Sequence, residues 1–107
     1  MFVLVDLGSY PPRVSLEEPD DTRRFHLAVR GGTDRALVFG ALVDAAAGRL
    51  EGDDAWITID AVRRLAAGHV EPTWDDQFAA MLDYARTKGW VDETTHALQA
   101  HVEWPDG

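Results

Sequence analysis

The side chains of this chain that could hold a metal ion are four histidines and their acidic neighbours. His101 and Glu103 lie two residues apart in an alternating segment, so they would share one face of a strand. His96 would face the other side of the sheet, which leaves His69 or His26 as a remote third ligand. Because zinc sites take three or four converging ligands, the sequence predicts no metal site and no cofactor.

The chain offers few groups for nucleophilic catalysis. It has no Cys, and Ser9 and Ser15 stand in a Pro-flanked and an acidic segment without a nucleophile-elbow motif. The acidic runs EEPDD and EGDD are typical of solvated turns, and Gly31-Gly32 is too short to cradle a phosphate. We therefore expect a non-catalytic protein. The alternative is a small enzyme or ligand carrier whose pocket the sequence does not reveal.

The chain of 107 residues is strongly acidic, with 19 Asp and Glu against 10 Lys and Arg and a net charge of −9. The excess is concentrated in residues 71–107, where eight acids face only Arg86 and Lys88. The absence of Cys suits a reducing compartment. The apolar run at the start of the sequence is too short for a signal peptide or a membrane-spanning helix. We expect one cytoplasmic domain over residues 1–107 that does not enter a membrane.

The N-terminal part reads as a β-layer over residues 1–32. Strands are expected over residues 2–7, 13–18 and 25–30, where apolar and polar side chains alternate or β-branched residues gather. A helix from Asp34 to about Ala47 follows, with Thr33 as its cap. Apolar residues extend around most of this helix, so we expect a central helix that other elements cover on more than one side.

Residues 33–107 then predict a turn, a strand, two helices and a hairpin. GRLEGDD reads as the turn, AWITI as the strand and AVRRLAAG as a short helix capped by Asp60. In TWDDQFAAMLDYARTKGW, Thr73 and Asp76 match a capping box. Five apolar residues of this helix share one face, namely Trp74, Phe78, Met81, Leu82 and Ala85. The hairpin WVDETTHALQAHVEW places Val91 opposite Leu98, and its longer second strand needs a further partner, for which residues 56–59 are available.

This order of elements resembles the winged helix-turn-helix superfamily. The resemblance covers residues 34–104 and rests on ITIDAVRRLAAG, TWDDQFAAMLDYARTKGW and WVDETTHALQAHVEW. It implies an α+β, winged-helix-like domain preceded by two or three N-terminal strands. No family-specific motif accompanies it, so it carries over no catalytic or base-reading residue.

In DNA-binding members of that superfamily the third helix enters the major groove. Here its outward face carries Asp76, Asp83 and Thr87, and the tip of the presumed wing carries Asp92 and Glu93. Carboxylates repel phosphates, so this surface lacks the main source of affinity for DNA. The alternative is a transcriptional regulator that binds through an arginine patch. The candidates are Arg23, Arg24, Arg30, Arg35, Arg63 and Arg64.

We therefore expect a protein-interaction or regulatory module. One candidate surface is the acidic end, which we define as Asp76, Asp83, Thr87, Asp92 and Glu93 and which would suit a basic protein or peptide. Trp104 is a candidate apolar contact for a partner. A free edge of the N-terminal sheet could accept a strand from a peptide or from a second copy, which makes a homodimer one expected assembly.

Overall fold

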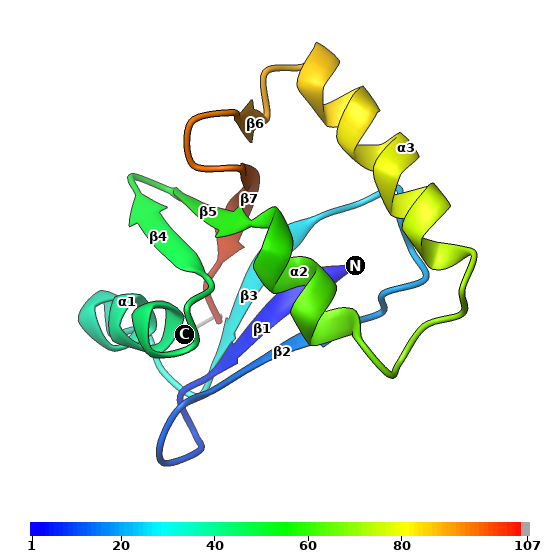
Figure 1. Cartoon of the computed structure of the whole chain (residues 1–107). Helices are drawn as coiled ribbons and strands as arrows, with labels where there is room; N and C mark the ends of the chain where they lie inside the picture. The colour runs from blue at the N-terminus through cyan, green and yellow to red at the C-terminus, as the bar shows by residue number, and fades with distance from the viewer. Residues whose placement is uncertain (106–107) are drawn as a thin grey trace.

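The structure is a computed structural model that describes residues 1–105, and it confirms an α+β fold in which helices pack on a mixed sheet (Figure 1). Residues 106 and 107 of the predicted single domain lie outside the described part. The strands are β1 (Phe2–Asp6), β2 (Arg13–Glu17), β3 (His26–Arg30), β4 (Gly48–Glu51), β5 (Asp54–Thr58), β6 (Val91–Asp92) and β7 (Ala97–Glu103). The helices are α1 (Arg35–Asp44), α2 (Ile59–Ala66) and α3 (Trp74–Thr87).

All the strands belong to one sheet, in the order β2-β1-β3-β7-β5-β4, with β6 also paired to β7. Three N-terminal strands are present, and they do not form a layer of their own, because β3 pairs with β7 in parallel. The predicted pairing of β7 with residues 56–59 is confirmed in part. β5 lies along Ala97–His101, whereas the far end of β7 pairs with β3.

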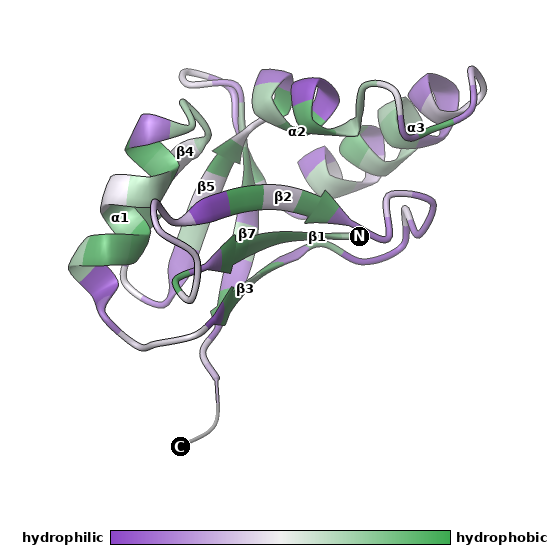
Figure 2. Cartoon of the chain, turned by 90° about the horizontal axis from the view of Figure 1, so that it is seen from below, coloured by the Kyte–Doolittle hydropathy of each residue, from purple (hydrophilic) through white to green (hydrophobic). Residues whose placement is uncertain are grey.

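One face of the sheet is buried and the other is open. Val3 is aligned with Leu27 on the neighbouring strand, and Ile57 is aligned with Leu98. Each of these four side chains is at most 2% exposed. The helices cover this face, with α2 and α3 together and α1 at one end of the molecule (Figures 1 and 2). The opposite face of the sheet carries no helix within residues 1–105. No helix in that range is long and apolar enough to cross a membrane.

The predicted turn at residues 48–54 is wrong, because Gly48–Glu51 forms β4 and only Gly52 and Asp53 connect it to β5. The tight turn of a two-residue hairpin connection requires a positive φ, which glycine adopts without strain. Gly52 supplies it, with a φ of 58°. β4 is therefore the second edge strand of the sheet, opposite β2.

The helix starts differ from the predicted caps. Asp34, not Thr33, caps α1, and its carboxylate accepts hydrogen bonds from the backbone N–H groups of Ala36 and Leu37. Thr58, not Asp60, caps α2 by accepting from Ala61 N–H. Thr73 precedes α3 without a side-chain cap, so the predicted capping box is not formed. In α1 and α2 the capping side chain lies just before the first helical residue, where it reaches unpaired N–H groups.

The apolar face predicted for α3 is confirmed. Trp74, Phe78, Leu82 and Ala85 are at most 3% exposed, and Met81 is partly buried against the same core. The Trp74 indole N–H also donates to the Pro19 carbonyl oxygen at 2.7 Å. This bond ties the start of α3 to the loop between β2 and β3.

Candidate functional site

The outward face of α1 is the most unusual surface of the molecule. Val38, Ala41 and Leu42 pack into the core, but Leu37, Phe39 and Val43 are 51%, 47% and 54% exposed. The expectation that other elements cover this helix on more than one side is therefore wrong within residues 1–105. We call Leu37, Phe39 and Val43 the α1 face. A helix that is apolar on nearly all sides is ordinarily buried on nearly all sides, so this one lacks a cover.

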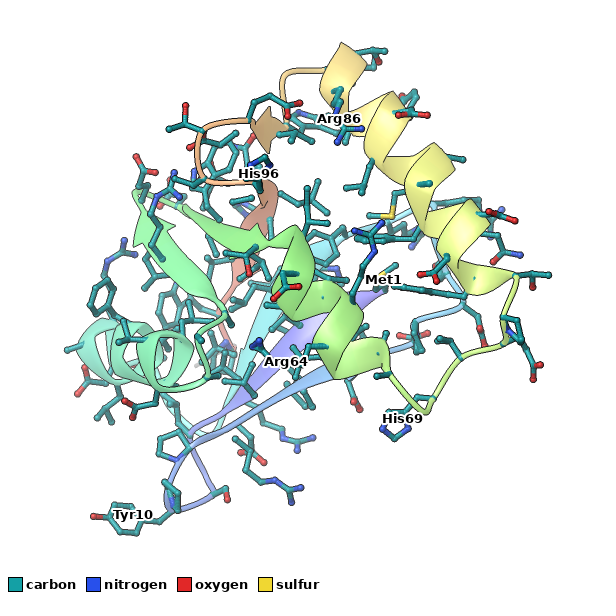
Figure 3. The ribbon with its side chains drawn as sticks, in the orientation of Figure 1. Met1, Tyr10, Arg64, His69, Arg86 and His96 are labelled. Atoms are coloured by element: carbon teal, nitrogen blue, oxygen red, sulfur yellow. The ribbon has the colours of Figure 1, made fainter. Side chains whose placement is uncertain are left out.

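The segment that carries the α1 face has no net charge of its own, and Arg64 from α2 lies at the end of the helix. Ala36 lies beside it on the exposed side of the helix. Residues 31–50 carry Asp34 and Asp44 against Arg35 and Arg49. The tip of the β1-β2 hairpin projects below α1, and there Tyr10 is fully exposed and points away from the molecule (Figures 1 and 3). Exposed apolar side chains gathered in this way mark interaction sites.

The acidic end is built partly from ion pairs. Asp76, Asp83 and Thr87 are exposed on α3, as the sequence predicts. Arg86 donates to Asp83 at 3.1 Å and to Glu93 at 2.9 Å, and so joins the helix to the β6-β7 turn. The Thr87 hydroxyl donates to the Tyr84 carbonyl oxygen. These contacts leave a surface that is acidic but partly neutralised by its own arginine.

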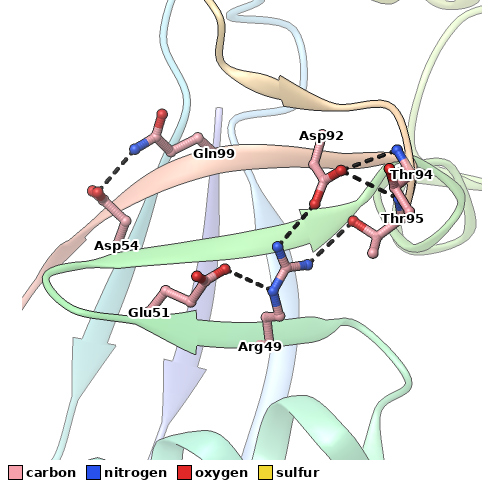
Figure 4. A network of polar contacts seen from close by, with 7 residues as sticks. All are labelled: Arg49, Glu51, Asp54, Asp92, Thr94, Thr95 and Gln99. Atoms are coloured by element: carbon pink, nitrogen blue, oxygen red, sulfur yellow. Dashed lines mark hydrogen bonds and ion pairs between the residues drawn. The ribbon is translucent and has the colours of Figure 1, made fainter.

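Asp92 is only partly exposed, and its carboxylate is held by hydrogen bonds within the fold. It accepts hydrogen bonds from Arg49 on β4 at 3.0 Å and from the backbone N–H of Thr94, also at 3.0 Å (Figure 4). The Thr95 side chain is the largest of the stabilising contacts that hold the pKa of Asp92 below its usual 3.8, although partial burial acts in the opposite direction. Asp92 therefore joins the β6-β7 turn to β4.

Asp92→Asn should lower the melting temperature at neutral pH. A carboxyl group whose pKa is lowered by folding stabilises the folded state above its unfolded pKa, and the contribution is lost as the pH falls through the folded value. The difference between wild type and variant should therefore shrink below about pH 3.8. Thermal unfolding followed by circular dichroism measures this difference. Asp76→Asn is the control, since Asp76 has no ion pair or side-chain hydrogen bond within the described chain. If the difference in melting temperature between wild type and Asp92→Asn did not change with pH, the stabilising role of the Asp92 carboxylate would be contradicted.

Trp104 does not lie with the acidic end. It follows the last residue of β7, whereas Glu93 precedes the first residue of that strand, so the two are at opposite ends of it. Its ring is partly buried against the core.

Two of the four histidines lie beside a carboxylate. His26 lies 3.2 Å from Glu103, and His101 lies 3.6 Å from Asp54. The structure thus brings His26 beside Glu103 across the β3-β7 pairing. His69 lies on the α2-α3 connection (Figure 3). No group of three His, Asp or Glu side chains in residues 1–105 is arranged to hold a metal ion.

The six arginines of the candidate patch come from different elements, and several have local partners. Arg30 pairs with Asp6 at 2.9 Å and Arg63 lies 4.0 Å from Asp75. Arg64 donates to the Ala45 carbonyl oxygen at the end of α1. These contacts give three of the arginines a structural role.

Comparisons with protein-family models, with curated proteins and with solved structures found no match to this chain.

Proposed function

We propose that this domain is a non-catalytic protein-interaction module that pairs with a second copy of itself through the α1 face. The observation that carries the proposal is the exposure of Leu37, Phe39 and Val43 on a helix whose other side is fully buried. Aromatic and aliphatic side chains at the centre of an interface contribute most of its binding energy. Phe39 is the natural anchor of such a contact.

The charge distribution favours a second copy as the partner. Two molecules of net charge −9 repel each other, and the cost depends on where the charges meet. Residues 31–50 are neutral in sum, whereas Asp76, Asp83 and Thr87 of the acidic end lie on α3, at the opposite side of the molecule from α1 in both views (Figures 1 and 2). Asp92 lies closer to α1, and Arg49 on β4 pairs with it. Contact through α1 therefore keeps the acidic faces of the two α3 helices apart. Tyr10 on the neighbouring hairpin would extend the contact toward the roughly 800 Å² per partner of a stable interface.

The proposal includes a winged-helix-like arrangement of the C-terminal elements. The order β5, α2, α3, β6, β7 and the pairing of β5 with β7 support a winged-helix-like arrangement. Its α3 carries Asp76 and Asp83 outward, and this supports a basic protein or peptide as the ligand of the acidic end, in preference to DNA. In a homodimer the two acidic ends would both remain accessible.

Sedimentation equilibrium tests the association. Wild type should show a monomer-dimer equilibrium, and Phe39→Glu should raise the dissociation constant about a hundredfold or more, because it places a charge in an apolar contact. Its melting temperature at low protein concentration should stay close to that of wild type, since Phe39 is half exposed in the monomer. Gln77→Glu adds the same charge at an exposed position of α3 and is the matched control.

A wild-type chain that stays monomeric at all concentrations would overturn the proposal. Equal dissociation constants for wild type and Phe39→Glu would place the contact elsewhere on the molecule and would also overturn it.

A further inference from the structure

We propose that the cleft between α3, residues 22–25 and β7 binds a small anion that carries a planar aromatic ring. The cleft has a volume of about 630 Å³, within the usual range of ligand sites. It is independent of the α1 face, with which it shares no residue. We define the cleft by the residues that carry the argument, which are Arg23, Arg24, Asp54, Tyr84, Trp90 and His101.

The position of the cleft follows from the topology of the sheet. One edge of β7 is paired first with β6, antiparallel, and then with β3, parallel. The change takes place between Gln99, whose N–H donates to the Trp90 carbonyl oxygen, and His101, which is aligned with His26. At this point along β7, the segment that leads into β3 and the segment that leads into β6 move apart from each other.

The aromatic wall supports a planar ligand. Tyr84 and Trp90 are 59% and 44% exposed and form an edge-to-face pair with ring centroids 6.1 Å apart. Met81 and Phe25 line the same cleft and are partly buried. The two ring planes meet at 68°, so each ring offers its own exposed apolar face, on which a planar ligand can stack at little entropic cost. The Lys88 ammonium lies 5.6 Å from the centre of the Tyr84 ring.

The charges at the cleft support an anion. Arg24 lines it and has no ion-pair partner within residues 1–105, while Arg23 has only a distant contact of 3.8 Å with Asp21. The single carboxylate in the lining, Asp54, accepts a hydrogen bond from the Gln99 side chain at 2.8 Å (Figure 4). It also lies 3.6 Å from His101. The lining thus holds two arginines against one carboxylate on a protein of net charge −9, and the Arg23 side chain is 92% exposed to solvent. Arginine binds carboxylate and phosphate groups with two hydrogen bonds.

The indole N–H signals in a ¹⁵N-¹H correlation spectrum test the proposal. The chain has four Trp, of which Trp90 lines the cleft, while Trp56, Trp74 and Trp104 do not. The probes are 2-naphthoate, adenosine monophosphate and the uncharged 2-naphthalenemethanol. We expect an anionic probe to shift the Trp90 signal in a saturable way and to leave those of Trp74 and Trp104 in place. A response to naphthoate alone indicates an aromatic acid as the ligand, and a response to the nucleotide alone indicates a nucleotide.

Arg24→Gln should weaken the binding of the anionic probe about tenfold, since one charge-assisted contact is lost. Arg13→Gln removes an exposed arginine at the other end of β2 and should leave the affinity unchanged. The remaining indole signals report that each variant is folded. The proposal fails if neither anion moves the Trp90 signal, if the uncharged probe binds as well as the anions, or if both arginine variants bind like wild type.

Discussion

Phe78→Ala should lower the free energy of unfolding by about 3–5 kcal/mol, the usual cost of removing a buried phenylalanine ring. Phe78 is fully buried and stacks on Trp74 with ring centroids 4.8 Å apart. The Arg63 guanidinium lies over the same ring at 5.4 Å. Losing the ring would leave a cavity between α3, α2 and the sheet, so this substitution should have the largest effect on stability. Urea unfolding followed by tryptophan fluorescence measures it.

Gln77→Ala is the control for this prediction. Gln77 precedes Phe78 on α3 and is exposed, and its replacement should change the free energy of unfolding by less than about 0.5 kcal/mol. Similar losses for both substitutions would mean that α3 is not anchored through Phe78.

Gly48→Ala should cost about 3 kcal/mol, because the start of β4 lies unusually close to β5. A Cβ atom at Gly48 would overlap the Trp56 carbonyl oxygen and lie 2.9 Å from its carbonyl carbon. Both atoms are backbone, so they can move only if the β4-β5 hairpin opens. Thermal unfolding measures the loss of stability.

Gly52→Ala separates this effect from the general cost of replacing a glycine. Gly52 has a φ of 58°, and a Cβ there would have no neighbour within 4 Å. Its replacement should cost about 1 kcal/mol, from backbone conformation alone. If Gly52→Ala destabilised the chain as much as Gly48→Ala, close packing of β4 on β5 could not be the reason.

Local patterns in the sequence predict those parts of the fold that depend on neighbouring residues. The buried face of α3 follows from its helical spacing, and the β6-β7 hairpin has the predicted alignment of Val91 with Leu98. By contrast, β4 has only four residues and is followed at once by Gly52 and Asp53, so the stretch as a whole matches a turn. The parallel pairing of β3 with β7 joins segments about 75 residues apart, as His26 and His101 show, and no local pattern encodes it.

The same distinction applies to the candidate sites. The apolar surface of α1 is visible in the sequence, but the pattern does not say whether the same chain covers it, and within residues 1–105 Leu37, Phe39 and Val43 remain exposed. The cleft draws on residues 22–25, Tyr84, Trp90 and His101, which only the assembled sheet brings together. The exposed pair of Tyr84 and Trp90 was within reach of sequence reasoning, because Tyr84 lies off the buried face of α3.

The distance between spin labels on two copies tests the central claim most directly. The chain has no Cys, so Asp44→Cys at the end of α1 and Asp76→Cys at the start of α3 each give one labelling site. If two copies meet through the α1 face, labels at position 44 should give a defined distance shorter than that at position 76. No dipolar coupling at position 44 under conditions where the wild-type chain should be a dimer, or a shorter distance at position 76, would contradict the account.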